Sequence, residues 1–158
     1  MAHKTIPGYL ISEEFFKGRK RIVYRAIREE DKKPVIIKTL SKENPSDSEV
    51  ANLKREYEII KNLDHECFIK AFDFVSDRKR PAIVLEDIGG KSLRFFIDNG
   101  EVDFTTQLEI AIKLADSLAY LNQNQIIHKD INPKNIVVNL ETKEFRVIDF
   151  SISGCISN

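Results

Sequence analysis

The sequence lacks the features that mark several classes of protein. Its two cysteines, Cys67 and Cys155, make neither a disulfide framework nor a metal-binding spacing, which is typical of a reducing cytosol. It has no apolar run as long as a membrane span and no signal-peptide core at the N-terminus. The formal net charge of zero gives no overall field that attracts nucleic acid or membrane. We therefore expect a soluble, cytoplasmic chain with no nucleic acid and no membrane as partner.

What is present suits a compact domain. The 158 residues are 42% hydrophobic, which suffices for a core, and there is no internal repeat. Period-2 alternation predicts strands over residues 9–16, 21–28, 34–40, 68–75, 82–85, 136–138 and 145–148. Helical periodicity predicts helices over residues 49–62, 92–97 and 105–122, the first of them capped by Ser46 or Ser48.

The strand over residues 34–40 carries one lysine among apolar side chains. Ile36 and Leu40 flank Lys38 on its own face of the strand, and the other face is also apolar. Burying an unpaired ammonium costs several kcal/mol, so the strand predicts an anion nearby. The alternative is a lysine that extends from a half-exposed strand into water.

The helix over residues 49–62 offers a partner for this lysine. Leu53, Tyr57 and Ile60 recur at helical spacing, and Glu56 lies at the edge of their apolar stripe. Glu56 can therefore face the sheet, whereas Glu58 fits the solvated position that most helical carboxylates occupy. We expect an ion pair between Glu56 and Lys38.

Three polar residues near the C-terminal end are spaced for chemistry. Asp130 precedes Asn135 by five residues, and Asp149 follows a predicted hairpin. A hard cation such as Mg²⁺ prefers oxygen ligands of this kind. On residue type alone, turn-capping roles for the two Asp residues and the Asn are favoured over a magnesium site.

The order of these residues resembles that of the protein kinases. H-K-D-x-x-x-x-N followed by D-F-S is similar to the catalytic loop and the magnesium motif of that family, and V-I-I-K is similar to its strand-three lysine motif. The resemblance implies that Asp130 accepts the proton of the substrate hydroxyl and that Asn135 and Asp149 hold Mg²⁺. It also implies that Lys38, paired with Glu56, contacts the α and β phosphates of ATP.

Three positions depart from the family pattern. Lys129 replaces the usual Arg and cannot make its bidentate fork. Asn132 stands where serine/threonine kinases place a phosphate-contacting Lys, and Lys134 is the available substitute. Ser151 replaces the Gly of D-F-G and removes backbone freedom there.

The N-terminal hairpin resembles the glycine-rich lid over the ATP phosphates. Val23 begins a V-Y-x-A sequence, and aligned from it only the middle lid glycine survives, as Gly18. Phe16 and Arg21 occupy the flanking glycine positions, so basic side chains are the remaining source of positive charge for phosphate. An exposed basic hairpin with no ligand and a nucleic-acid patch are the alternatives.

The resemblance also places the adenine site. Leu85 corresponds to the gatekeeper and Glu86 to Ile88 to the hinge, with Ile88 expected to supply a backbone amide to adenine. The following Gly89-Gly90 fits equally well as a plain linker.

We therefore predict an α+β, protein-kinase-like fold. Residues 6–88 form a five-stranded antiparallel small lobe with helix C and the hinge, and residues 89–158 form an incomplete helical large lobe that ends after the D-F-G-like motif. The sequence is most similar to kinase domains at the start of large bacterial multisensor signalling proteins. The expected function is Mg-ATP-dependent phosphorylation of protein Ser/Thr, weak or absent in this chain by itself; the alternative is a pseudokinase-like nucleotide-binding or regulatory module.

The long helix over residues 105–122 has two apolar stripes, and the chain offers a cover for one. Expected partners are therefore a protein substrate, downstream signalling domains of a longer parent, or a second copy bound through the uncovered stripe.

Overall fold

The computed structural model describes residues 6–77 and 80–155. The chain divides into two compact units, one made of Met1–Lys61 and Lys70–Asp87 and the other of Asn62–Ile69 and Ile88–Asn158. The boundaries differ from the predicted 6–88 and 89–158 in two places, because Asn62–Ile69 and Ile88 fall in the second unit.

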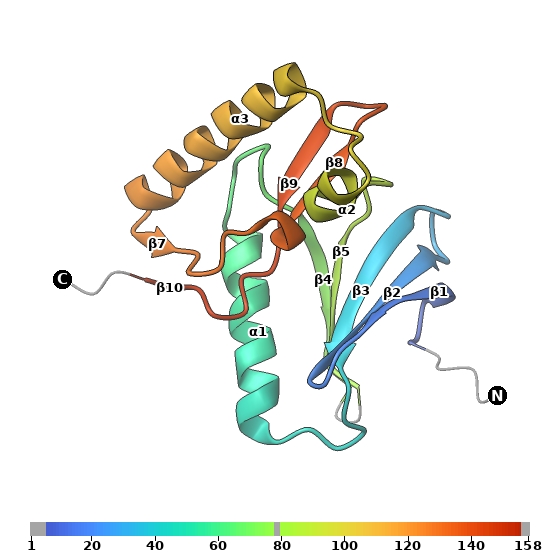
Figure 1. Cartoon of the computed structure of the whole chain (residues 1–158). Helices are drawn as coiled ribbons and strands as arrows, with labels where there is room; N and C mark the ends of the chain where they lie inside the picture. The colour runs from blue at the N-terminus through green and yellow to red at the C-terminus, as the bar shows by residue number, and fades with distance from the viewer. Residues whose placement is uncertain (1–5, 78–79, 156–158) are drawn as a thin grey trace. The chain divides into compact units, whose positions relative to one another are not determined.

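The first unit is a five-stranded antiparallel sheet with one helix. The strand order is β1-β2-β3-β5-β4, and α1 contacts β4 and β5 (Figure 1). This confirms the predicted fold class. The elements are β1 (Tyr9–Lys17), β2 (Arg21–Arg28), β3 (Pro34–Leu40), α1 (Asp47–Lys61), β4 (Ala71–Val75) and β5 (Ala82–Glu86).

The sheet buries side chains on both of its faces. Strand alternation places one set in a core on the face opposite to Lys38. The other face turns Lys38 toward α1, whose buried residues include Leu53, Glu56 and Tyr57. The opposite core comprises Ile6, Ile22, Tyr24, Ala26, Val35, Ile37, Ala82 and Val84.

Two reciprocal hydrogen bonds between Ser46 and Glu49 cap the N-terminus of α1. The backbone N–H of Glu49 donates to Ser46 Oγ at 3.3 Å, and the backbone N–H of Ser46 donates to Glu49 Oε2 at 2.9 Å. This is a capping box, which satisfies amides that the helix itself leaves unpaired. Of the two predicted caps, Ser46 is the one used.

In residues 62–69 and 88–155, the second unit contains two helices and two small sheets. Both helices lie within two residues of their predicted bounds, and Ser92 and Asp103 cap them. The two-residue strands and the 3-10 turn were not predicted. The elements are β6 (Lys91–Ser92), α2 (Leu93–Asp98), α3 (Phe104–Gln123), β7 (Ile126–Ile127), η1 (Pro133–Asn135), β8 (Ile136–Asn139), β9 (Glu144–Val147) and β10 (Gly154–Cys155), with sheet orders β6-β8-β9 and β10-β7.

The predicted strand over residues 68–75 is wrong in its first part. Ile69 N–H donates to Val147 O at 3.2 Å, and Val147 N–H donates to Cys67 O at 2.7 Å, so this segment pairs with β9 of the second unit. Phe68 packs edge-on against Phe150 there, with ring centroids 5.8 Å apart. The apolar run is continuous in sequence, but its hydrogen bonds change partner before β4 begins at Ala71.

The Gly89-Gly90 pair is more constrained than a plain linker. Gly89 has a φ of +67°, in the left-handed region that favours glycine. A Cβ at Gly90 would lie 2.6 Å from Val138 O, so any side chain there would clash with backbone. Asn139 Nδ2 also donates to Ile88 O at 2.8 Å, which fixes the chain just before the two glycines.

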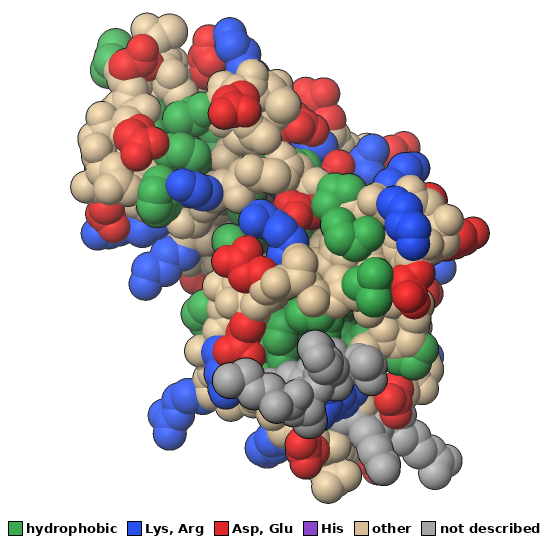
Figure 2. Space-filling model, turned by 90° about the vertical axis from the view of Figure 1, so that its right-hand side faces the viewer, with side chains coloured by type: hydrophobic (Ala, Val, Ile, Leu, Met, Phe, Trp, Pro, Cys, Tyr) green, Lys and Arg blue, Asp and Glu red, His purple; other side chains and the backbone are tan. Residues whose placement is uncertain are grey.

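Charged side chains of both signs are mixed over the surface seen in Figure 2. Among the helices in residues 6–77 and 80–155, none combines the length and apolar character that a membrane span requires.

Candidate functional site

In the first unit, Lys38 and Glu56 form the ion pair that the sequence predicts. Lys38 Nζ donates to Glu56 Oε1 at 2.7 Å. Lys38 is 7% exposed and Glu56 is 1% exposed, so the pair is almost wholly removed from water. Removing either partner alone would leave a buried charge.

A second cation reaches the same carboxylate. Arg21 Nη1 donates to Glu56 Oε2, so each oxygen of Glu56 binds one cation. In the β2–β3 register, Val23 is opposite Lys38 and Arg21 is opposite Leu40, which puts Arg21, Val23 and Lys38 on one face of the sheet. Sequence reasoning assigned Arg21 to a lid-glycine position and did not find its partner.

The predicted lid hairpin is present, and Gly18 lies in its turn. Gly18 N–H donates to Arg21 O at 2.8 Å and closes the turn. A Cβ at Gly18 would lie 2.9 Å from the ring of Phe16, which is exposed and free to move aside. Neither the hydrogen bond nor the neighbouring ring therefore requires a glycine at this position.

The predicted adenine-site residues lie in different units. Leu85 is buried at the end of β5, and Glu86 N–H donates to Lys70 O at 2.9 Å, both within the first unit. Ile88 belongs to the second unit, where its carbonyl accepts the bond from Asn139.

In the second unit, two amide side chains hold Asp130. Asn132 Nδ2 donates to Asp130 Oδ1 and Asn135 Nδ2 donates to Asp130 Oδ2, each at 2.8 Å. Asn132 Oδ1 also accepts from Lys134 N–H at 2.9 Å and so caps the 3-10 turn η1. The residue that departs from the family pattern at position 132 thus orients the carboxylate of Asp130, while the Lys134 side chain is exposed.

His128 connects this loop to the segment before Asp149. Its Nδ1 accepts from Asp130 N–H at 3.2 Å, so its Nε2 carries the proton and donates to Ile148 O at 3.0 Å. The ring is 2% exposed and packs edge-on against Phe150. Sequence reasoning treated His128 only as the first letter of the motif; an apolar Ile-Ile run directly before it is the signal that it is buried.

Asn135 and Asp149 provide oxygen donors on joined segments. Ile148 N–H donates to Asn135 O at 2.9 Å, which ties the residue before Asp149 to the catalytic-loop motif. Asp149 has a φ of +63°, a conformation that costs energy for a residue with a Cβ and often marks functional sites. The Asn135 amide nitrogen is bound to Asp130, which leaves its oxygen as the donor for a cation. A carboxylate and an amide oxygen suit Mg²⁺.

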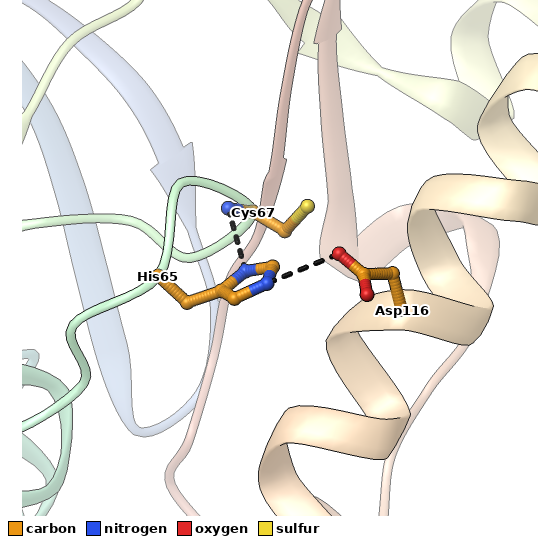
Figure 3. A group of neighbouring side chains, drawn as sticks. All are labelled: His65, Cys67 and Asp116. Carbon is orange, nitrogen blue, oxygen red and sulfur yellow. Dashed lines mark hydrogen bonds and ion pairs between the residues drawn. The ribbon is translucent and has the colours of Figure 1, made fainter.

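A separate group of potential metal ligands lies between the start of the second unit and α3. His65, Cys67 and Asp116 place their ligand atoms within 4.8 Å of one another. Figure 3 shows the imidazole of His65 between the backbone nitrogen of Cys67 and the Asp116 carboxylate, at 3.2 and 3.1 Å. Because Nδ1 accepts from Cys67 N–H, Nε2 carries the proton and has no lone pair for a metal. Burial also raises the pKa of the Cys67 thiol, which opposes the thiolate. The group therefore acts as a hydrogen-bonded link.

Comparison with known proteins gives a consistent result. The model of the protein kinase domain matches residues 9–158. The chain is 31% identical over 147 residues to a probable serine/threonine-protein kinase of Clostridium acetobutylicum, covering 92% of this chain and 22% of that protein. It is 27% identical over 151 residues to serine/threonine-protein kinase ULK3 of Mus musculus, covering 94% of this chain and 32% of that protein. It is 28% identical over 145 residues to serine/threonine-protein kinase fused of Drosophila melanogaster, covering 92% of this chain and 18% of that protein.

Proposed function

Because the chain belongs to the protein kinase family, we propose that it binds Mg-ATP and takes part in phosphoryl transfer to Ser or Thr hydroxyls of proteins. The chain spans between about a fifth and a third of the length of the three relatives described above. The observation that carries the proposal is the buried pair between Lys38 Nζ and Glu56 Oε1, because a paired ammonium on the inner face of the sheet is prepared to bind a polyphosphate.

The residues divide the work as follows. Lys38, oriented by Glu56, contacts the α and β phosphates, and Val23, Leu85 and the backbone of Glu86 and Ile88 form the adenine site. Asn135 and Asp149 hold Mg²⁺, which neutralises phosphate charge when it is bound. Asp130 orients the hydroxyl and accepts its proton.

The exposed Lys134 contributes positive charge for the γ phosphate in place of the Lys replaced by Asn132. Phosphoryl transfer depends mainly on positioning and on charge neutralisation. The residues named above include the types that supply both. The mixed surface charge and two free cysteines agree with a cytoplasmic setting, which forms part of the proposal.

Calorimetric titration with Mg-ATP tests the proposal. We expect saturable binding that is lost in Lys38→Met and weakened without Mg²⁺ or in Asp149→Asn. Lys54→Met is the matched control, because Lys54 is exposed on α1 and has the same charge. No binding by the unaltered chain, or equal binding by Lys38→Met, would reject the nucleotide site.

A second candidate is nucleotide binding without catalysis. Phe16 and Arg21 stand at lid-glycine positions, Ser151 follows D-F, and Arg21 is engaged with Glu56. Transfer of radiolabelled phosphate to a generic protein substrate, lost in Asp130→Asn, decides for catalysis. Because transfer is expected to be weak or absent in this chain by itself, binding of Mg-ATP without transfer decides for this second candidate when it is measured in a longer version that continues the kinase domain.

The partner proposal concerns α3. Its exposed large apolar side chains lie on the helix of the second unit and suit a protein surface such as a substrate, a further domain or a second copy. Light scattering over a concentration series tests the last of these, with Ile112→Glu expected to abolish any self-association. The exposed residues are Phe104, Leu108, Ile112 and Leu118, at 73%, 49%, 69% and 41%.

A further inference from the structure

We propose that Arg21 is a positioning residue of the nucleotide site, which clamps the second oxygen of Glu56 and thereby fixes both Lys38 and the lid hairpin. The inference rests on the proposed function for its effect on nucleotide. The clamp itself rests only on contacts within the first unit.

Both carboxylate oxygens of Glu56 are bound by cations. Its carboxylate is 1% exposed, and its two oxygens bind Lys38 Nζ and Arg21 Nη1. A buried carboxylate oxygen without a donor is costly, because it has lost its water. The Arg21 side chain is 21% exposed, and it reaches from the first residue of β2 into this buried site. The two cations therefore bind the Glu56 carboxylate at the same time, each at its own oxygen, and do not compete for one oxygen.

Arg21 is the first residue of β2, and its carbonyl accepts from Gly18 N–H to close the β1–β2 turn. The same turn is fastened to the residue after β3, because Ser41 Oγ donates to Arg19 O at 2.7 Å and Ser41 N–H donates to Lys20 O at 3.0 Å. Arg21 adds a side-chain bond from this turn region to Glu56 on α1.

An arginine at position 21 supplies a side chain that a glycine there would lack. A glycine gives a backbone N–H to a ligand but provides no side chain for Glu56. An arginine keeps its positive charge at every accessible pH and forms directional bonds to carboxylates. The departure at Arg21 thus exchanges a flexible lid for one joined to the helix that carries Glu56. We expect Lys38 to be better oriented for phosphates as a result.

Nucleotide titration of the 158-residue chain tests the effect. Arg21→Gln is expected to weaken Mg-ATP binding about tenfold, a change of about 1.4 kcal/mol in binding free energy. It should leave affinity for adenosine unchanged, because adenosine has no phosphates for Lys38. Arg21→Lys should restore part of the affinity. Arg19→Gln is the matched control, because it removes the same charge from the exposed turn of the same hairpin.

A double-mutant cycle tests the clamp without nucleotide. Arg21→Gln, Glu56→Gln and the double variant are unfolded in urea, and the effect of Arg21→Gln should largely vanish once Glu56 is altered. Additive effects would overturn the clamp. Equal loss of Mg-ATP and adenosine affinity in Arg21→Gln, or no loss beyond that of Arg19→Gln, would overturn the positioning role. If the unaltered chain binds no Mg-ATP, the proposed function and the positioning role fail together, and the cycle alone judges the clamp.

Discussion

The two units hold their candidate functional residues by different physical means. In the first, Glu56 is nearly inaccessible and is fixed by two cations. In the second, Asp130 is exposed and is fixed by the neutral amides of Asn132 and Asn135. Removing one partner of a buried ion pair lowers the free energy of unfolding strongly, because the remaining charge is left without water or a partner. A lost hydrogen bond to an exposed carboxylate costs less, because water replaces it. Substitutions should therefore destabilise the first unit more than they destabilise the second.

The largest expected effect is that of Glu56→Ala. It leaves Lys38 and Arg21 without their shared carboxylate, and we expect a loss of about 3–5 kcal/mol in the free energy of unfolding. Urea denaturation measures it. Glu58→Ala on the exposed side of α1 is the control and should change stability by less than about 1 kcal/mol. A loss no greater than that of the control would remove the claimed difference between the units.

The next effect concerns His128, a buried polar residue in the catalytic-loop motif of the second unit. His128→Phe keeps the ring but leaves Asp130 N–H and Ile148 O without their partners. We expect a loss of about 2–4 kcal/mol, since each of these two part-buried groups costs about 1–3 kcal/mol when it is left without a partner. Thermal and urea unfolding provide the measurement, and Ser153→Ala, which removes one bond to the His128 carbonyl, should cost less. If His128→Phe leaves stability unchanged, water replaces both hydrogen bonds and His128 does not stabilise the fold.

Asn132 and Asn135 allow a sharper test within the second unit. Each donates to one carboxylate oxygen and to the backbone carbonyl of Asp130, and replacing either by Ala should cost about 1 kcal/mol of stability. Only Asn135→Ala should also weaken the Mg²⁺ dependence of ATP binding, because Asn135 is the proposed ligand. Parallel titrations with and without Mg²⁺ separate the two. Equal loss in both variants would indicate that the orientation of Asp130, and not metal ligation, sets the affinity.

The sequence predicted the contacts that depend on periodicity. Strand alternation put Lys38 on the inner face, and helical spacing put Glu56 at the edge of a stripe, so their meeting followed from local rules. The Arg21 contact did not follow, because a long side chain reaches Glu56 from an element that no periodicity relates to α1. The start of β4 was misplaced because an apolar run does not reveal which strand accepts its hydrogen bonds. The asparagine bonds to Asp130 were also beyond reach, since they depend on the fold of the loop.

The smallest expected effects compare one helix cap in each unit under acid. Hydrogen bonds from the Ser46 backbone, followed by Lys42, lower the pKa of Glu49 from 4.5 to about 2. The bond from Thr106 N–H lowers the pKa of Asp103 as well. Because both pKa values are depressed in the folded state, each carboxylate contributes stability above its unfolded pKa and loses it as the pH falls through the folded one.

Melting temperatures measured from pH 6 down to pH 2 should therefore fall less steeply in Glu49→Gln and in Asp103→Asn than in the unaltered chain. Asn still caps a helix, so Asp103→Asn should alter the slope while changing stability at pH 6 very little. Glu49→Gln also loses the bond to Lys42 and should show the larger difference at pH 6. An unchanged slope in both variants would mean that neither carboxylate contributes to the loss of stability in acid.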